Sequence, residues 1–339
     1  MNTIARIVNG LGQNQKALPH GKPFMMQSKK GLLNLIPKTT DKFVIIITAI
    51  HEMPQRKRIK ICLSIIICMA ISNGVIAQNS AFSWLEPVPL DSISRVLDIA
   101  VPEGFNRTNT DSNSFGSWLR RLPLKAKDTP LKLYDNIEKW NQSDHYRIID
   151  IDVGNADLQQ CADAVIRLRA EYLYATGKYT MIHFNFTSGD TAWFRKWAEG
   201  YRPQINGDNV RWNRSASVCR DYQTFRTYLD SVFMYAGSHS LSKELDTVDD
   251  LEKIQAGDVF INGGFPGHAV IVIDVAQSSS KDQVAFLIAQ SYMPAQDIHI
   301  LKNPNNEDIS PWYIVNDGDC LDTPSWVFDW SSLRRFESR

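Results

Sequence analysis

Apolar positions along the chain follow two periods, one of two residues and one of three to four. Period-two runs predict strands at 147–153 (RIIDIDV) and at 180–186 (TMIHFNF). After residue 237, short apolar runs between turn residues predict further strands at 259–262, 269–275, 284–290, 297–301 and 312–315. Polar turn residues join the runs 269–275 and 284–290, so we expect these two runs to form an antiparallel hairpin.

The longer period predicts helices. Residues 155–174 place apolar side chains at three- and four-residue steps, with Asn155 as the expected N-cap, and residues 221–237 predict a second amphipathic helix. Shorter helical patches are expected near 91–98 and 133–140. Helices followed by an antiparallel meander are typical of an α+β fold. We therefore expect N-terminal helices packed on a small antiparallel sheet, with a helical insertion at about 176–237.

The N-terminal region has the pattern of a targeting segment. Residues 53–77 combine a basic stretch, a short apolar run and a small residue at its end, which predicts a secretory signal peptide. Residues 1–52 are then an over-extended start, and 78–330 form a single domain. This predicts an exported protein, periplasmic or associated with the cell envelope, without a transmembrane span after the signal is removed. The alternative is a short anchor that stays uncleaved.

Charge and cysteine content change once residues 1–77 are set aside. The remainder carries 26 basic and 35 acidic residues, a net charge of −9, which argues against nucleic acid as a partner. It keeps Cys161, Cys219 and Cys320. In an oxidising compartment Cys219 and Cys320 are able to pair and leave Cys161 free, although a fully reduced set is equally compatible with the sequence.

The loop 262–267 (NGGFPG) leads directly into His268, at the start of an apolar run. The hairpin expected here places His268 opposite Gln290, within one residue, so an amide oxygen is able to orient the imidazole. A base oriented in this way calls for a nucleophile, and Cys161 near the start of the strongest helix is the candidate. Cys161, His268 and Gln290 are thus the predicted catalytic residues.

These segments resemble those of NlpC/P60-type cysteine peptidases and amidases. The carrying features are a helix with Cys161, then GDVFI at 257–261, then GHAVIVID at 267–274 and a strand that ends in Gln290. The resemblance implies a papain-like α+β domain that cleaves cell-wall peptides. The chain departs from the family pattern around Gln160, and the separation of 107 residues between Cys161 and His268 requires an insertion.

A second resemblance covers nearly the whole chain after residue 77. The segments WLRRLPL, QCADAVIRLRAEYLY and AQSYMPAQDIHIL are similar to those of secreted bacterial proteins of the domain-of-unknown-function 4846 family. That resemblance implies no activity.

Other residues complete the hypothesis of a secreted cysteine hydrolase acting on a cell-wall peptide or glycan. The expected substrate-binding residues are Arg120, Arg202, Trp193, Trp197, Asn262 and Gly267. No metal or other cofactor is expected, and we expect a monomer. The alternatives are that Cys161 is a buried core thiol, or that the same fold is a non-catalytic envelope module that binds peptidoglycan or glycan fragments.

Overall fold

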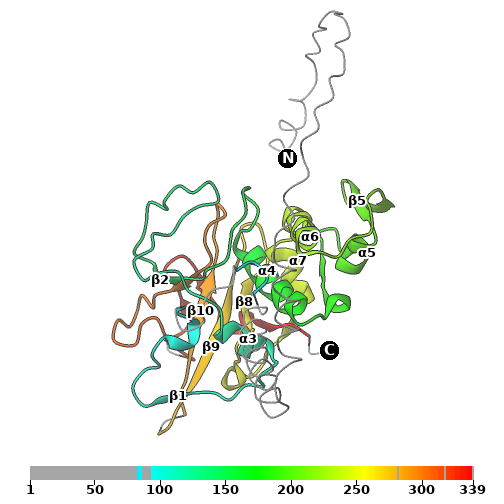
Figure 1. The fold of residues 1–339 in the computed structure, drawn as a ribbon. Coiled ribbons are helices and arrows are strands. Elements are labelled where there is room, and N and C mark those ends of the chain that lie inside the picture. Colours follow the sequence, from blue (N-terminus) through cyan, green and yellow to red (C-terminus); the bar gives the residue numbers. More distant parts are fainter. Residues whose placement is uncertain (1–81, 86–92, 281, 317, 338–339) are drawn as a thin grey trace, which may run out of the picture. The chain divides into compact units, whose positions relative to one another are not determined.

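The computed structural model describes residues 82–85, 93–280, 282–316 and 318–337 (Figure 1). They lie in one structural unit, Ile67–Arg339. The expected signal peptide at 53–77 and the over-extended start at 1–52 lie outside the described residues. Among the described helices, none is long and apolar enough to cross a membrane.

The centre of the fold is a nine-stranded antiparallel sheet with the order β2-β11-β10-β9-β8-β15-β7. Strand β1 also pairs with β9, and β12 with β10. The bounds of these strands are β1 Phe105–Arg107, β2 His145–Ile148, β7 Asp246–Thr247, β8 Val259–Asn262, β9 His268–Ser278, β10 Val284–Gln290, β11 His299–Leu301, β12 Tyr313–Ile314 and β15 Leu333–Arg335.

Helices and small hairpins surround the sheet. The α-helices of the described residues are α3 Phe115–Arg120, α4 Cys161–Ala175, α5 Phe194–Ala198, α6 Tyr222–Tyr235 and α7 Ser238–Glu244. Separate two-stranded hairpins are β3 His183–Asn185 with β4 Thr191–Trp193, β5 Tyr201–Asn206 with β6 Asn209–Arg214, and β13 Leu321–Asp322 with β14 Val327–Phe328. Short 3₁₀ helices are η3 Val96–Asp98, η4 Tyr179–Met181, η5 Leu251–Lys253 and η6 Trp330–Ser332.

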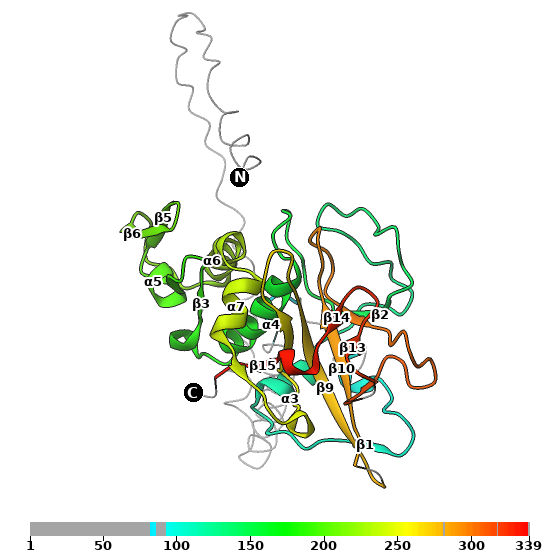
Figure 2. The same ribbon diagram turned by 180° about the vertical axis from the view of Figure 1, so that it is seen from behind.

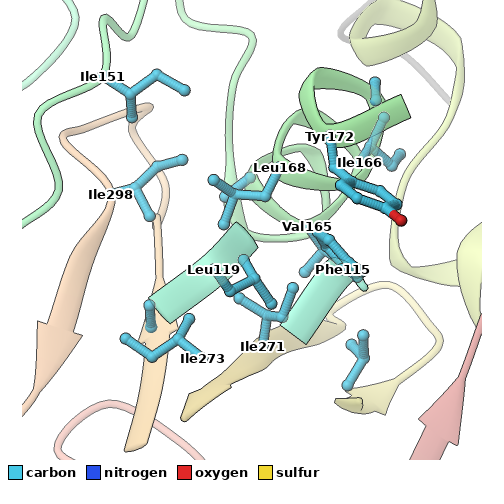
Figure 3. Packing of buried hydrophobic residues seen from close by; sticks show 14 of the residues in the cluster. Phe115, Leu119, Ile151, Val165, Ile166, Leu168, Tyr172, Ile271, Ile273 and Ile298 are labelled. Carbon is cyan, nitrogen blue, oxygen red and sulfur yellow. The ribbon is translucent and has the colours of Figure 1, made fainter. Parts of the chain in front are cut away.

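The sheet is buried on both faces, which explains why β9 and β10 read as continuous apolar runs. On one face Val165 and Leu168 of α4 and Leu119 of α3 pack in the same core as Ile271 and Ile273 (Figure 3). On the other face the C-terminal segment around β13, β14 and η6 covers β8, β9 and β10 (Figure 2). A second core forms there from Phe260, Val270, Val272, Phe286, Ile288, Phe328 and Leu333.

The expected hairpin between residues 269–275 and 284–290 is confirmed as β9–β10, but with a different register. The predicted register placed His268 opposite Gln290. The observed pairs are Val284 with Gln277 and, beyond an irregularity, Ala289 with Ile271. The shift places the turn further along the chain than the polar residues suggested.

The start of α4 differs from the prediction in a way that affects the candidate site. The helix begins at Cys161, not near Asn155, and Gln160 is its N-cap. The backbone N–H of Gln160 donates to the Asp163 carboxylate at 3.1 Å, as in a capping box. The Asp157 carboxylate accepts from the backbone N–H of Ala295, a tertiary contact that holds the preceding segment outside the helix.

The expected fold class, N-terminal helices on a small antiparallel sheet with a helical insertion, is wrong. The described residues form a mostly β structure with a nine-stranded sheet and five α-helices. Two short strands from the first half of the region, β1 and β2, join the sheet through long-range pairing with β9 and β11. The segment 176–237 contains the hairpins β3–β4 and β5–β6 beside α5 and α6, so it is not purely helical.

Candidate functional site

Helix α4 places Cys161 at its first position and directs this residue toward the start of β9. The side chain is partly buried and packs against the core shared by α4 and the sheet. Backbone N–H groups of Ala162 and Ala269 lie close enough to the sulfur to act as hydrogen-bond donors that lower its pKa. Cys161 therefore lies next to the residue that follows His268.

His268 and Gln290 form a buried hydrogen-bonded pair at one end of the sheet. His268 is the first residue of β9 and Gln290 the last of β10, and both are almost fully buried. The distance from Nε2 of His268 to Oε1 of Gln290 is 2.7 Å. The structure thus brings together these two predicted catalytic residues, by a diagonal contact between neighbouring strands.

A third strand fixes the tautomer of His268. Nδ1 of His299 lies 2.8 Å from the carbonyl oxygen of Asp297, and an oxygen there only accepts, so this nitrogen carries the hydrogen. Nε2 of His299 is then an acceptor for the amide nitrogen of Gln290, at 3.4 Å. The amide oxygen of Gln290 consequently accepts from Nε2–H of His268. Nδ1 of His268 is left with its lone pair, as a proton acceptor.

Aromatic rings surround the imidazole of His268. Ring centroids lie at 5.0 Å for Tyr292, 5.3 Å for Trp326 and 5.9 Å for Phe328. Trp326 and Phe328 come from the C-terminal segment, far from His268 in sequence. These rings keep water away from the His268–Gln290 pair and lower the local dielectric.

Burial has the largest effect on the protonation states of Cys161 and His268. It raises the pKa of the Cys161 thiol to about 11, with a smaller effect from the Asp163 carboxyl. Asp163 is itself buried and its own pKa is raised, so burial is the cause that we consider decisive for the thiol. Burial lowers the pKa of His268 to about 4, against the opposing hydrogen bond from Gln290. At neutral pH both groups are therefore uncharged.

The sulfur of Cys161 packs with the core on the α4 face of the sheet, whereas the imidazole of His268 lies against Trp326 and Phe328, which belong to the C-terminal segment on the other face. Within the described part of the chain, no hydrogen bond joins Sγ of Cys161 to the ring of His268. The four cavities of about 860, 510, 280 and 190 Å³ are not lined by either side chain. The structure thus supplies an oriented neutral base at the start of β9 and a neutral thiol at the start of α4, the two types of group that general-base activation of a thiol needs.

The loop before His268 is shaped by contacts within the protein. Asn262, at the end of β8, pairs with His268 across the ladder. A Cβ atom on Gly267 would lie 2.2 Å from Oγ of Ser238 and 2.6 Å from the carbonyl oxygen of Asn262. Gly267 is therefore required for the close packing of this loop on α7, where the sequence suggested access for a substrate backbone.

The two arginines expected to anchor carboxylates are engaged inside the protein. Nε of Arg120 lies 2.5 Å from the buried Asp274, and its other nitrogens donate to Thr108 and to the carbonyl of Val275. Arg202 donates to two backbone carbonyl groups, and its guanidinium lies 3.9 Å from the centroid of the Trp197 ring. These contacts hold both side chains in structural roles.

The predicted binding tryptophans occupy different environments, both in the segment 176–237. Trp197 is buried in the main core, with its ring centroid 6.0 Å from that of Tyr228. Trp193 is partly exposed, has its ring centroid 4.3 Å from that of His183 in a tilted arrangement, and lines a cavity of about 190 Å³. The structure does not bring either tryptophan into contact with Cys161 or His268.

A polar groove beside the start of α4 was not predicted from the sequence. It measures about 860 Å³ and is lined by the segment 150–156 and by Leu158, directly before the candidate nucleophile. Charged side chains of both signs and three aromatic residues line it: Lys125, Lys132, Arg226, Asp150, Asp152, Asp230, Asp297, Trp84, Tyr134 and Tyr222. Its walls come from segments far apart in sequence, so no local pattern announces it.

The described residues outside this site show neither a disulfide nor a group of side chains placed to bind a metal ion. Cys161, Cys219 and Cys320 are all free, so the pairing of Cys219 with Cys320 is not formed. Among the residues that the structure describes, no group of three or more His, Cys, Asp or Glu side chains is placed to hold a metal ion.

Comparison with known proteins gives one match. The sequence model of a family described as "Domain of unknown function (4846)" matches residues 96–335. No curated protein and no solved structure matches the chain.

Proposed function

The chain belongs to the domain-of-unknown-function 4846 family, and from its geometry we propose that it is a secreted cysteine hydrolase that cleaves an amide bond in a cell-wall-type peptide. One observation carries the proposal. The His268–Gln290 pair, held by His299, leaves Nδ1 of His268 as a proton acceptor, and the next residue, Ala269, contacts the sulfur of Cys161 at the start of α4 through its backbone N–H.

The chemistry begins with a neutral thiol. As Sγ of Cys161 attacks the substrate carbonyl carbon, its proton passes to Nδ1 of His268. The C–N bond then breaks, a thioester remains on Cys161, and the imidazolium returns the proton to the leaving amine. Water, deprotonated by His268, hydrolyses the thioester and releases the acid. Gln290 accepts from Nε2–H throughout, which stabilises the imidazolium while it exists.

The start of α4 supports the negative oxygen that forms during attack. The first N–H groups of a helix have no intrahelical acceptor, and they carry the positive end of the helix dipole. Those of Cys161 and Ala162 lie beside the sulfur. Donors at this place are able to stabilise a tetrahedral intermediate on the carbonyl that the sulfur attacks.

The groove beside α4 favours a peptide that carries both charges. Lys125 and Asp297, and Arg226 and Asp152, pair with each other, which leaves Lys132, Asp150 and Asp230 as lining charges without an ion pair to a described residue. Aromatic rings also line the groove, and its volume of about 860 Å³ accommodates several residues. Cell-wall peptides contain free carboxylates and amino groups on short chains, which suit such a lining. Part of the groove wall, residues 150–156 and Leu158, precedes Cys161 closely in sequence.

A second candidate is a non-catalytic envelope module that binds peptidoglycan or glycan fragments. The uncharged states of Cys161 and His268 favour this binding module, because a pKa of about 11 for Cys161 and about 4 for His268 leaves no resting thiolate. In that case the groove alone carries the function, and its aromatic residues Trp84 and Tyr134 supply the stacking surfaces.

Incubation of the protein with muropeptides and with purified peptidoglycan, followed by mass spectrometry of the products, tests the proposal. We expect one class of amide bond to be cleaved. Cys161→Ser and His268→Ala should each abolish the cleavage, because they remove the nucleophile and the base. Cys219→Ser is the matched control, since it changes another partly buried free thiol away from the site.

Two results discriminate the candidates. Cleavage that persists in Cys161→Ser rules out the proposed nucleophile. Retention of muropeptides without any cleavage, unchanged in Cys161→Ser and weakened by Tyr134→Ala in the groove, selects the binding module instead.

A further inference from the structure

A second cavity lies along α4, beyond the candidate site. It measures about 510 Å³ and is bordered by the loop 108–111, the start of α3, residues 253–257 and the C-terminal segment. Arg169, which lies eight residues after Cys161, faces it from α4. Eight residues of helix correspond to roughly 12 Å along the axis, so this cavity is separate from Cys161.

Arg169 is a cation without a hydrogen-bond acceptor among the described residues. Its guanidinium lies over the rings of Phe115, Tyr172 and Phe336, at 5.2, 5.7 and 5.0 Å from their centroids (Phe115 and Tyr172 are seen in Figure 3). Among the described residues, no hydrogen bond and no ion pair involves this guanidinium. The three rings hold the group in place and remove part of its hydration, while the N–H donors remain without acceptors.

Positively charged side chains outnumber negatively charged ones around the cavity. Four cations line it and only two carboxylates, in a protein region that is acidic as a whole. Nζ of Lys178 lies 5.3 Å from the ring of Tyr172 and 3.3 Å from its hydroxyl, and forms no ion pair with a described carboxylate. Arg335 and Lys253 are already paired with Asp258 and Asp250. Arg169 and Lys178 are therefore the two lining cations without an ion pair to a described carboxylate, although Asp111 and Glu337 also line the cavity.

The neutral wall of the cavity supplies fixed polar groups. Thr108, Asn109 and Thr110 line it. Arg120 holds this loop, donating to the carbonyl oxygen of Thr108 at 2.6 Å and to its hydroxyl at 3.0 Å. Because Arg120 is anchored on the buried Asp274, the loop is positioned before any ligand arrives. Preorganised hydroxyl and amide groups beside two cations suit a tetrahedral oxyanion.

We propose that this cavity is a binding site for a phosphate group, held by Arg169 and Lys178 against the loop 108–110. A phosphate dianion provides an anionic partner for these two cations, neither of which is ion-paired with a described carboxylate. Its oxygens supply acceptors for the caged guanidinium, and the hydroxyl of Thr110, which accepts from Arg120, keeps its hydrogen for a phosphate oxygen, whereas that of Thr108 donates to the carbonyl of Val275. The site does not depend on the chemistry of Cys161 or His268, and it goes beyond the hydrolase.

Titration calorimetry of the full chain with inorganic phosphate, at constant ionic strength set by chloride, tests the proposal. We expect saturable binding that weakens at least about tenfold in Arg169→Gln, since a charge-assisted hydrogen bond is lost together with the cation. Arg211→Gln is the matched control, because Arg211 is exposed on β6 and far along the chain from the cavity. Its phosphate affinity should equal that of the unaltered chain.

Further arms remove the remaining ambiguities. Lys178→Gln should weaken binding while it keeps Arg169 and its three rings, because Lys178 contacts only Tyr172 of the three, so it tests the site even where Arg169→Gln fails to fold. Glucose 6-phosphate that binds much more tightly than phosphate identifies a phosphorylated sugar as the ligand class, and equal affinities identify the free anion. Absence of phosphate binding above the chloride background, or binding that both variants leave unchanged, overturns the proposal.

Discussion

The protonation states of Cys161 and His268 lead to a quantitative prediction for alkylation of the thiol by iodoacetamide. Only the thiolate reacts. With a pKa of about 11, Cys161 is about 0.01% thiolate at pH 7, compared with about 3% for an unperturbed thiol. A thiolate of higher pKa is intrinsically more nucleophilic, which returns about a factor of ten. We therefore expect Cys161 to react roughly 30-fold more slowly than the same residue in the denatured chain.

The assay measures labelling of the peptide that contains Cys161 by mass spectrometry, from pH 6 to pH 10. The rate should rise about tenfold per pH unit throughout, because ionisation limits it over the whole range. His268→Ala should leave the rate at pH 7 within about twofold, since an imidazole with a pKa of about 4 is already uncharged there. Cys219, labelled in the same digest, reports whether reagent and pH behave as intended.

One pattern refutes this reasoning. A rate that levels off below pH 7 and drops in His268→Ala reveals a resting thiolate–imidazolium pair. Burial would then not control the two pKa values, and the mechanism would begin from an ion pair instead of a neutral thiol.

Three further predictions concern the site and its support. Gln290→Leu removes the hydrogen bonds at Nε2 of His268 and Nε2 of His299 and should lower the free energy of unfolding by about 2–4 kcal/mol in urea denaturation. Exposed Gln277→Ala should change it by less than about 0.5 kcal/mol. Burial lowers the pKa of His299 to about 3. The contribution of the neutral imidazole to folding stability is therefore complete above the unfolded pKa near 6.5 and is lost as the pH falls toward 3. The difference in free energy of unfolding between the unaltered chain and His299→Gln should shift by about 2 kcal/mol from pH 7 to pH 5. Arg120→Ala leaves the buried Asp274 with one ion-pair partner and should destabilise the fold by about 3–5 kcal/mol, a loss that thermal unfolding detects; an unchanged melting temperature contradicts the structural role.

Local patterns were enough for the central strands. The runs 259–262 and 284–290 are strands at those bounds, because each is a continuous apolar run bounded by turn residues. The size of the sheet was not predictable in the same way. Strands β1 and β2 contain three and four residues, too few for a periodic signal, and they exist only because β9 and β11 offer them edges.

The candidate site shows the same division. The proximity of His268 and Gln290 was expected from the hairpin, and the two-residue error in register did not prevent a diagonal contact. The third member of the chain, His299, was missed because its position depends on the pairing of Gln290 with His299 across β10 and β11. A histidine within a short strand directly after Gln290 was the available signal. The start of α4 was displaced by a side-chain contact from Asp157, which no local propensity encodes.

Strand β9 has a mechanical consequence for the two proposed sites. Its 11 residues extend for roughly 36 Å, with His268 at one end. Asp274, further along the same strand, anchors Arg120 and through it the loop that borders the phosphate cavity. The strand is thus a rigid element that both sites share. Hydrogen bonds to β8 and β10, together with the ion pairs of Arg107 and Arg120 with Asp274, prevent β9 from shifting along its own axis. Binding of a ligand at one end of β9 should therefore leave the other end unchanged, so the protein is able to bind one ligand at each site independently.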